Sequence, residues 1–352
     1  MKRSSRTRLA VIVAACAIVA VVVAVAVTRD GIPADAVRIQ DWHDLHAIRE
    51  DMSGSYVLMN DLDSTTAGYQ ELASRAANNG SGWEPIGQAD FLEYGIVGDP
   101  FEGTFDGRGY EIRDLLIGRS DENTVGLFGI VGEGGVVLNA GVASANVTGH
   151  FTVGALAALN LGVVGGCYST GSVNGNSAVG GLLGGNGGNV SSSYSTADAT
   201  GKTVAGGLVG MNNYGTVTDS YATGSVTRVY GTDTSFGGFV GRNREGKIVN
   251  CYSTGGVDYG EEASPTSNGF AGSVVTDGDY EMTAYYWDVE TSGQSSTAGD
   301  ASGRTTAEMM DIATYEGWSI AAVDDPGSRN TAYTWNIVGG QTYPFLSWQR
   351  RF

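Results

Sequence analysis

Basic residues are scarce in this 352-residue chain, and lysine occurs only at Lys2, Lys202 and Lys247. The 20 Lys and Arg are outnumbered by 38 Asp and Glu, which gives a formal net charge of −18. A surface of this sign repels nucleic-acid phosphates and anionic lipid headgroups. The composition therefore predicts no nucleic-acid partner and favours solvation at high ionic strength, and a saline habitat is the hypothesis that follows.

Helical periodicity and catalytic signatures are also missing. No apolar period of 3.6 residues runs through residues 125–272, which excludes the helix pairs of tetratricopeptide and HEAT repeats. The three histidines, His43, His46 and His150, include no HExxH spacing. His43 and His46 lie three residues apart and could supply two metal ligands, but exposed polar residues on a helix are the simpler interpretation.

The middle of the chain contains one short phrase repeated six times. A small-glycine-apolar core recurs as VGLFG (Val125–Gly129), VGALA (Val153–Ala157), VGGLLG (Val179–Gly184), AGGLVG (Ala205–Gly210), FGGFVG (Phe236–Gly241) and NGFAG (Asn268–Gly272). A second phrase follows at a steady offset, as CYSTGSV from Cys167, SYSTADA from Ser193, SYATGSV from Ser220 and CYSTGGV from Cys251. Turns rich in glycine and asparagine separate the two phrases.

A fixed period of this size predicts units that stack because none can bury its apolar face alone. Short alternating apolar runs between Gly, Asn, Ser and Asp favour strand, turn, strand, turn in each unit. The sequence therefore predicts an all-β solenoid, a parallel β-helix with coils about 4.8 Å apart. Each large side chain that it buries stabilises by roughly 1.5–3 kcal/mol. Two ladders of like residues are expected, an aromatic one of Tyr168, Tyr194, Tyr221, Tyr252 and Tyr286, and an aliphatic one of Leu156, Leu182, Leu208, Phe239 and Phe270.

The three cysteines do not predict a disulfide. Cys167 and Cys251 occupy the same phase of the repeat, but Ser193 and Ser220 hold that phase in the two units between them. Three coil steps are about 14 Å, twice the Cα separation that a disulfide spans. We therefore expect Cys167 and Cys251 to be reduced, buried side chains in the stack.

The GGLVG-x-N pattern followed by CYSTGxV resembles the GLUG-motif repeats of bacterial and archaeal surface proteins. The likeness is close from Val125 to Gly272 and looser over Trp83–Gly118, which looks like the coil that leads into such repeats. The resemblance implies a right-handed β-helix in an extracellular setting, without one agreed activity. Such repeats accompany some metallopeptidases, but this chain lacks the catalytic motif, so that role is not carried over.

The N-terminus predicts a membrane anchor. A basic tail over residues 1–8 precedes 19 apolar residues, 9–27, which as a helix would span about 28 Å of the roughly 30 Å hydrocarbon core. The basic flank is expected inside, which places the linker 28–40 and all that follows outside the cell. Cleavage of a signal peptide after Ala36 and lipidation at Cys16 are the alternatives.

Caps are predicted on both sides of the repeat region 124–287. Residues 41–123 are expected to form an N-terminal cap and leading coils: an amphipathic helix over Trp42–Glu50 capped by Asp41, a strand over Ser55–Met59, and a hairpin-type turn at Asp106-Gly107. Residues 288–352 are expected to form a second lid. They include the capping-box sequence Thr305–Glu308, a helix that ends near Gly317, and a closing hairpin over 335–346.

The candidate sites are weak. Carboxylates in turns are the ligands that calcium prefers, and Asp277, Asp279 and Glu281 are the candidates, with Asp61 and Asp63 as a second pair. Glycoside cleavage requires paired carboxylates, yet Asp198, Asp219 and Asp258 fall in different phases of the repeat. Exposed tyrosines at turns, Tyr214, Tyr230 and Tyr259, could bind glycans without cleaving them. No other cofactor is predicted.

Together these features predict a membrane-anchored, extracellular β-helix that acts as a structural or adhesive scaffold without catalysis. Its expected partners are the membrane, through residues 9–27, and surface glycans or other envelope proteins. The alternative is a secreted β-helix that binds or cleaves polysaccharide. A cleft lined by two carboxylates would favour the enzyme, and a smooth flank of Ser, Thr and Asn would favour the scaffold.

Overall fold

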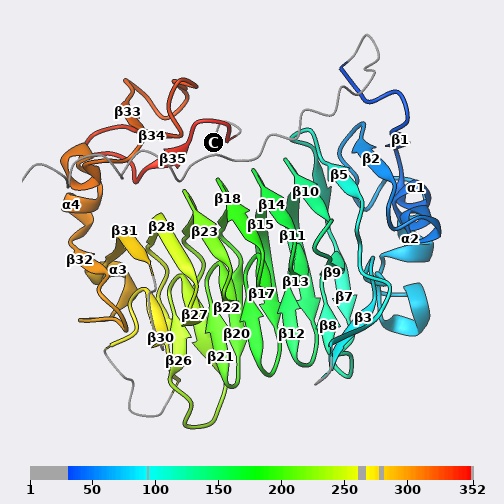
Figure 1. The fold of residues 1–352 in the computed structure, drawn as a ribbon, viewed down its shortest axis with the longest axis horizontal. Coiled ribbons are helices and arrows are strands. Elements are labelled where there is room, and N and C mark those ends of the chain that lie inside the picture. The colour runs from blue at the N-terminus through cyan, green and yellow to red at the C-terminus, as the bar shows by residue number, and fades with distance from the viewer. Residues whose placement is uncertain (1–30, 93–94, 261–266, 277–280, 350–352) are drawn as a thin grey trace, which may run out of the picture. The chain divides into compact units, whose positions relative to one another are not determined.

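The computed structural model describes residues 31–92, 95–260, 267–276 and 281–349 (Figure 1). The chain divides into two compact units, Met1–Ala36 and Val37–Phe352, and the second contains every helix and strand of the described residues. The predicted basic tail and anchor, with Cys16, lie outside them, as do Asp277 and Asp279. Among the residues that are described, no helix combines the length and the apolar character needed to cross a membrane.

The repeated phrase forms two columns of short parallel strands. Its beginning forms a five-stranded sheet of β8 (Thr124–Val125), β12 (Thr152–Gly154), β16 (Ala178–Gly180), β21 (Val204–Gly206) and β26 (Ser235–Gly237). Its end forms a six-stranded sheet of β9 (Phe128–Val131), β13 (Ala157–Asn160), β17 (Leu183–Asn186), β22 (Val209–Asn213), β27 (Val240–Arg244) and β30 (Ala271–Val275). The register pairs like with like, as Val153 with Val179 and Val179 with Ala205.

The rest of each coil joins a third sheet of 19 strands, which pair in parallel. Its strands are β1 (Val37–Ile39), β2 (Ser55–Leu58), β5 (Thr104–Asp106), β6 (Glu111–Arg113), β7 (Leu116–Gly118), β10 (Val136–Leu138), β11 (Gly141–Thr148), β14 (Val163–Gly165), β15 (Tyr168–Asn174), β18 (Asn189–Ser191), β19 (Tyr194–Ser195), β20 (Asp198–Gly201), β23 (Thr216–Thr218), β24 (Tyr221–Ala222), β25 (Val226–Arg228), β28 (Lys247–Ser253), β29 (Val257–Asp258), β31 (Met282–Asp288) and β32 (Ser302–Arg304). The predicted parallel β-helix is therefore confirmed, and its handedness stays an expectation from the resemblance.

The interior is filled by the aliphatic ladder. Leu156, Leu182, Leu208, Phe239 and Phe270 are fully buried. Each amide from Leu156 to Phe239 donates to the carbonyl of the next member, at 2.9–3.1 Å. The neighbouring glycines are required, because a Cβ on Gly180 or Gly206 would lie 1.9 or 2.1 Å from the carbonyl oxygen of Leu183 or Val209.

A second interior ladder consists of asparagines. Asn160, Asn186, Asn212 and Asn243 occupy the same point in four successive coils and are at most 1% exposed. The Nδ2 of each donates to the Oδ1 of the next at 2.8 Å in all three pairs. At the far end, Asn243 Nδ2 donates to the Gly246 carbonyl at 3.0 Å. A buried side-chain amide that donates to one neighbouring coil and accepts from the other links the corners of adjacent coils by hydrogen bonds.

Both described cysteines are free and buried, as predicted. Cys167 Sγ lies 3.3 Å from the Gly165 carbonyl and Cys251 Sγ lies 3.2 Å from the Val249 carbonyl. The serines between them make the same contact, since Ser193 Oγ donates to Ser191 O at 2.8 Å and Ser220 Oγ donates to Thr218 O at 2.7 Å. Burial raises the pKa of the Cys167 thiol to about 12.

The N-terminal end of the β-helix is covered by short helices (Figure 1). Helix α1 (Trp42–Ala47) continues into the 3-10 turn η1 (Ile48–Glu50), and the Asp41 side chain caps it by accepting from the amides of His43 and Asp44. The predicted apolar stripe of Trp42, Leu45 and Ile48 is fully buried. Beyond it lie α2 (Tyr69–Leu72), η2 (Ala77–Gly80) and an antiparallel pair, β3 (Ala89–Leu92) and β4 (Gly95–Gly98).

The predicted hairpin at Asp106-Gly107 is wrong. Strands β5 and β6 on either side of it pair with β10 and β11 of the next coil and not with each other. The Gly107 amide donates to the Leu138 carbonyl of that coil at 2.8 Å. A turn between two strands of one coil uses the same residue types as a hairpin turn, so local sequence does not separate them.

The C-terminal region does more than close the end of the β-helix. After β31 and β32, with α3 (Val289–Ser292) between them, come α4 (Thr306–Met309), η3 (Ile312–Tyr315), β33 (Ile320–Ala322), β34 (Trp335–Ile337) and β35 (Phe345–Leu346). The capping box of Thr305 and Glu308 and the antiparallel β34–β35 pair are both present. The helix ends at Met309, several residues before Gly317, and the segment then turns back along the flank of the solenoid (Figure 1).

The asparagine ladder predicts the effect of Asn186→Ala. The change removes two ladder bonds and leaves the Oδ1 of Asn212 without its donor, so we expect the free energy of unfolding to fall by about 2–3 kcal/mol. Chemical denaturation of the full-length chain measures it. Asn189→Ala, three residues away and exposed, is the control and should change stability by less than about 0.5 kcal/mol. Equal losses in the two variants would contradict the ladder.

The shared contacts of cysteine and serine predict that Cys167→Ser with Cys251→Ser is tolerated. The introduced hydroxyls can donate to the Gly165 and Val249 carbonyls, so we expect the free energy of unfolding to change by less than about 1 kcal/mol. Denaturation curves of the parent chain should also coincide with and without reductant. A midpoint that falls on reduction would show a disulfide and break the register.

Candidate functional site

The tyrosine column, Tyr168, Tyr194, Tyr221 and Tyr252, lies on the outer side of the 19-stranded sheet. Successive ring centroids are 4.9, 4.9 and 5.0 Å apart, and the rings are within 4° of parallel. They face outward because alternate strand residues point to opposite sides, and the neighbours Cys167 and Ser169 are buried in the interior. The aromatic ladder is therefore a feature of the flank and not of the core.

The cover segment, residues 305–349, lies over this column. Trp335 approaches the rings of Tyr221 and Tyr252 at 6.0 and 5.8 Å, and Trp348 approaches Tyr194 at 5.8 Å. Polar contacts fix the two surfaces together: Tyr252 OH donates to the Pro344 carbonyl at 2.5 Å, Gln349 Nε2 donates to Tyr221 OH at 2.6 Å, and Trp348 Nε1 donates to the Ser192 carbonyl at 3.1 Å. This contact forms a second apolar cluster outside the solenoid.

Burial beneath the cover segment makes the tyrosines poor acids. Desolvation raises the pKa of Tyr221 and of Tyr252 well above the ordinary value, and it raises the pKa of Tyr194 to about 12. Phenols that stay protonated at neutral pH beneath a packed layer pack and donate hydrogen bonds rather than transfer protons. The column is structural.

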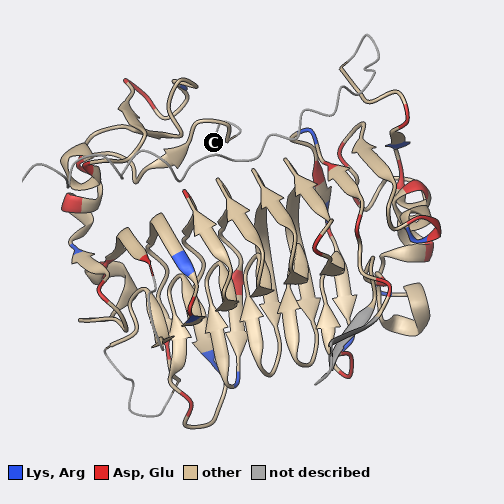
Figure 2. Ribbon diagram, viewed as in Figure 1, with Lys and Arg blue, Asp and Glu red and all other residues tan. Residues whose placement is uncertain are grey.

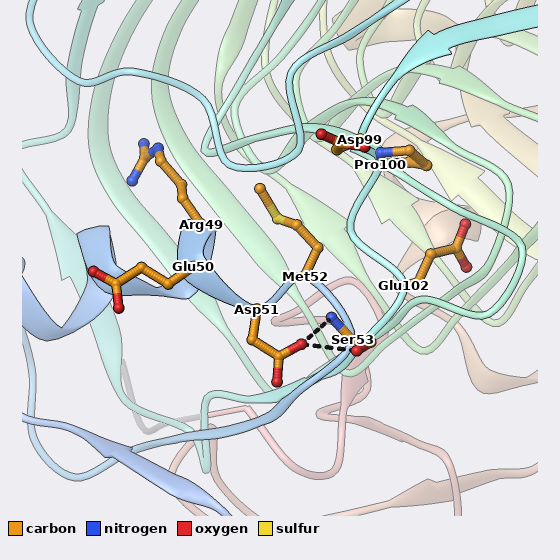
Figure 3. A pocket seen from close by; sticks show the side chains of 8 residues that line it. All are labelled: Arg49, Glu50, Asp51, Met52, Ser53, Asp99, Pro100 and Glu102. Carbon is orange, nitrogen blue, oxygen red and sulfur yellow. Dashed lines mark hydrogen bonds between the residues drawn. The ribbon is translucent and has the colours of Figure 1, made fainter.

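A hollow of about 520 Å³ beside the N-terminal cap is one candidate for an active site (Figure 3). Its carboxylates do not converge: in Figure 3 those of Glu50 and Glu102 lie on opposite sides, and Asp51 turns toward Ser53. Asp51 Oδ1 accepts from Ser53 Oγ at 2.7 Å, which lowers the pKa of Asp51, and Glu102 Oε2 accepts from the Gly134 amide at 2.7 Å. No acid and base face each other across this hollow, as cleavage of a glycosidic bond requires.

The flank formed by β18 and β23 is polar. Val190 and Val217 point into the core, so their neighbours face outward. Register pairs Asn189 with Thr216 and Ser191 with Thr218, which sets amide and hydroxyl groups in two rows. Outward Ser, Thr and Asn of this kind favour the scaffold.

Comparison with known families identifies part of this architecture. A family model described as the GLUG motif matches residues 201–227, which run from β20 through β25. One coil of the helix is thus a GLUG motif. This match confirms the resemblance drawn from the sequence, and the two adjacent coils join the GLUG coil strand for strand in register.

Two relatives match part of this chain. The chain is 34% identical over 148 residues to "Halomucin" of Haloquadratum walsbyi, covering 41% of this chain and 2% of that protein. It is 40% identical over 88 residues to a "Putative Gly-rich membrane protein" of Evansella cellulosilytica, covering 24% of this chain and 9% of that one. The chain thus spans less than a tenth of the length of either relative.

Among solved structures, the chain resembles a "putative immunoglobulin A1 protease" from Bacteroides ovatus. The TM-score is 0.47 at 16% identity, with 92% of this chain and 94% of that chain covered.

The carboxylates considered for carbohydrate cleavage do not meet, as their different phases indicated. Asp198, the first residue of β20, accepts from the Ser225 amide of the next coil at 2.9 Å, and Asp258 accepts from the Gly260 amide at 2.9 Å. Asp219 instead lies beneath the cover segment, where it accepts from Trp335 Nε1 and Asn250 Nδ2, both at 3.3 Å. Desolvation raises the pKa of Asp219, although the two hydrogen bonds act to lower it.

The predicted metal ligands are dispersed as well. His43 Nε2 contacts Glu71 at 3.2 Å, while His46 packs edge-on against Trp83, where burial lowers its pKa. Lys247 pairs with Glu281 at 3.0 Å, and Asp63 Oδ1 accepts from Thr65. Within the described ranges no three His, Cys, Asp or Glu side chains gather as a metal site would require, and the calcium prediction for Asp277 and Asp279 stays a prediction.

One of the three predicted glycan-binding tyrosines is misplaced. Tyr259 is 2% exposed and packs against Phe236 and the Arg228 guanidinium. Tyr214 and Tyr230 are 65% and 57% exposed. Sequence reasoning missed Arg244, whose guanidinium carbon lies 5.8 Å from the Tyr214 ring centroid. Three basic residues within 242–247 stand out in the sequence of this acidic chain and could have drawn attention to Arg244.

The environment of Asp219 predicts a pH-dependent gain from Asp219→Asn. A carboxyl whose pKa is raised on folding stabilises the fold only while it is protonated, so that contribution is lost as the pH rises above the unfolded value near 4. The asparagine Oδ1 can still accept from Trp335 and Asn250. We expect Asp219→Asn to raise the midpoint of thermal unfolding at pH 7 and to leave it unchanged at pH 3.5. Asp198→Asn, at an exposed position that begins β20, is the control, and an equal gain at pH 3.5 would contradict the argument.

Proposed function

We propose that this chain is an extracellular surface protein, tethered to the cell membrane through residues 9–27, whose β-helix serves as a structural or adhesive scaffold. The outward rows of Asn189, Ser191, Thr216 and Thr218 are the observation that carries the proposal. A solenoid with a filled interior displays an extended, repetitive face and binds along it without a deep pocket. Its acidic composition suits solvation outside the cell in salt, and the name of one relative contains the words membrane protein.

A secreted protein that binds polysaccharide is the second candidate. The exposed rings of Tyr214 and Tyr230 favour it, because large aromatic side chains in water are characteristic of binding surfaces. Both rings lie at corners between strands, and neither faces a carboxylate pair across a cleft. These tyrosines therefore support binding and offer no support for cleavage.

An adhesion assay tests the proposed function. Cells that display the full-length chain should be retained on a layer of cell envelope or surface polysaccharide, while the wells release no new reducing sugar ends. Adhesion and sugar release are measured on the same wells. The variant that lacks residues 1–30 is the matched control, since without the predicted anchor the chain should not be displayed on the cells and their retention should be lost.

Release of reducing ends by the full-length chain would overturn the scaffold proposal in favour of the enzyme. The variant Asp51→Asn with Glu102→Gln then asks whether the hollow of Figure 3 is responsible. Retention that is the same with and without residues 1–30 would overturn the tether.

A further inference from the structure

The corner between β22 and β23 holds an exposed tyrosine in an unusual backbone conformation. Register pairs Asn186 with Asn212 and Asn189 with Thr216, so this corner has one residue more than the glycine corner of the preceding coil. Tyr214 lies in this longer corner with φ of +60°. Its side chain is 65% exposed.

This conformation is unfavourable for a bulky side chain, although the next coil turns its equivalent corner through Glu245 in the same region, with φ of +51°. The left-handed region suits glycine, while an aromatic residue there is strained. The preceding coil turns the same corner through Gly187 and Gly188. A ring that is two-thirds exposed regains little of that cost through packing. Strained and exposed residues of this kind are characteristic of binding positions.

Two basic side chains flank this ring from the next coil. Arg244 pairs in register with Asn213, and its guanidinium carbon lies 5.8 Å from the Tyr214 ring centroid. Lys247 pairs in register with Thr216, and its Nζ contacts Glu281 at 3.0 Å on an exposed surface. Adjacent coils are about 4.8 Å apart, so a ring, a guanidinium, an ammonium and a hydroxyl lie within the reach of one or two sugar units.

Basic residues gather at this corner of an otherwise acidic protein. Residues 124–287 contain 11 Asp and Glu but only five Lys and Arg, which are Lys202, Arg228, Arg242, Arg244 and Lys247. Three of those five lie within 242–247 together with one acidic residue, Glu245, and Figure 2 shows how sparse basic residues are along the other strands. Arg242 donates to Ser235 Oγ and Ser273 Oγ at 3.3 and 3.4 Å, so Arg244 and Lys247 are the basic groups beside the ring. A local excess of basic groups on an acidic protein selects an anionic partner, because neighbouring surface repels it and only this corner attracts it.

We infer that Tyr214, Arg244 and Lys247 form a binding site for an anionic polysaccharide, one whose sugars carry carboxylate or sulfate groups. The inference rests on the proposed adhesive function and specifies its ligand class. The Tyr214 ring packs against the apolar face of a sugar, while Arg244 donates paired hydrogen bonds to the acidic group. Lys247 exchanges Glu281 for a second acidic group along the polymer, and the outward Thr216 and Asn189 meet sugar hydroxyls.

Binding of the full-length protein to polygalacturonate, dextran sulfate and neutral dextran tests the site. We expect binding to one or both charged polymers and none to dextran, with weakening in 1 M NaCl because the contacts are ionic. Tyr214→Gly and Arg244→Gln should each weaken binding at least 10-fold. Tyr214→Gly should keep or raise the thermal midpoint, since glycine relieves the left-handed strain, and a merely structural role for the ring would lower it.

A basic residue at a different corner provides the matched control. Lys202 lies beside the Tyr230 ring and away from Tyr214 and Arg244, so Lys202→Gln should leave binding within two-fold. Equal binding to dextran, or equal loss in this control, would overturn the inference. Dissociation of a self-associated form by Arg244→Gln, with polymer binding unchanged, would also overturn it and identify the acidic surface of a second copy as the occupant.

The outcomes separate this site from the proposed function. If cells still adhere and neither Tyr214→Gly nor Arg244→Gln changes polymer binding, the site is wrong while the adhesive function remains. If the charged polymers bind through Arg244 but cells do not adhere, the site remains and the adhesive function is wrong.

Discussion

The structure depends on contact between like residues in consecutive coils. A single coil has too few apolar side chains to enclose a core, so each buries its Leu or Phe against the same residue of its neighbours, as Phe239 does against Phe270 at 4.7 Å with rings 11° apart. The glycines beside this ladder bring strands so close that a Cβ would collide with a carbonyl. The apolar side chains can stack only if the strands approach closely, and close approach requires glycine. Together these two conditions explain the repeated small-glycine-apolar sequence.

Polar groups inside the solenoid obey the same like-on-like rule. The asparagine ladder works because the amide of Asn186 meets an identical amide on either side, which satisfies its donor and its acceptor at once. The ladder starts at Asn160, opposite Val131 in the leading coil. Cys167 and Cys251 fit among Ser193 and Ser220 for a similar reason, since a thiol or a hydroxyl can make the same contact with a carbonyl two residues earlier.

The two sides of the molecule that carry aromatic residues have different roles. On the flank, the tyrosine column is sealed by the cover segment, and its raised pKa values reflect that desolvation. At the corners, Tyr214 stays in water beside Arg244. The cover segment therefore converts most of an otherwise exposed aromatic surface into a second core. The aromatic side chains left exposed are concentrated where the coils turn, which is also where residue number varies between coils.

The sequence alone determined the coil register, since a period of about 26 to 31 residues with matched Leu, Tyr and Cys positions permits one stacking of like on like. It also determined the cap of α1, because Asp41 acts on its immediate neighbours. The tertiary structure alone decided that Asp106-Gly107 is a turn within a coil, that residues 305–349 fold back over the tyrosines, and that Tyr259 is buried while Tyr214 is exposed. Each of those outcomes depends on contacts between residues far apart in the chain, such as Trp335 with Tyr221. Local sequence does not predict these contacts, because the residues around a tyrosine at a turn are of the same types whether or not another segment covers it.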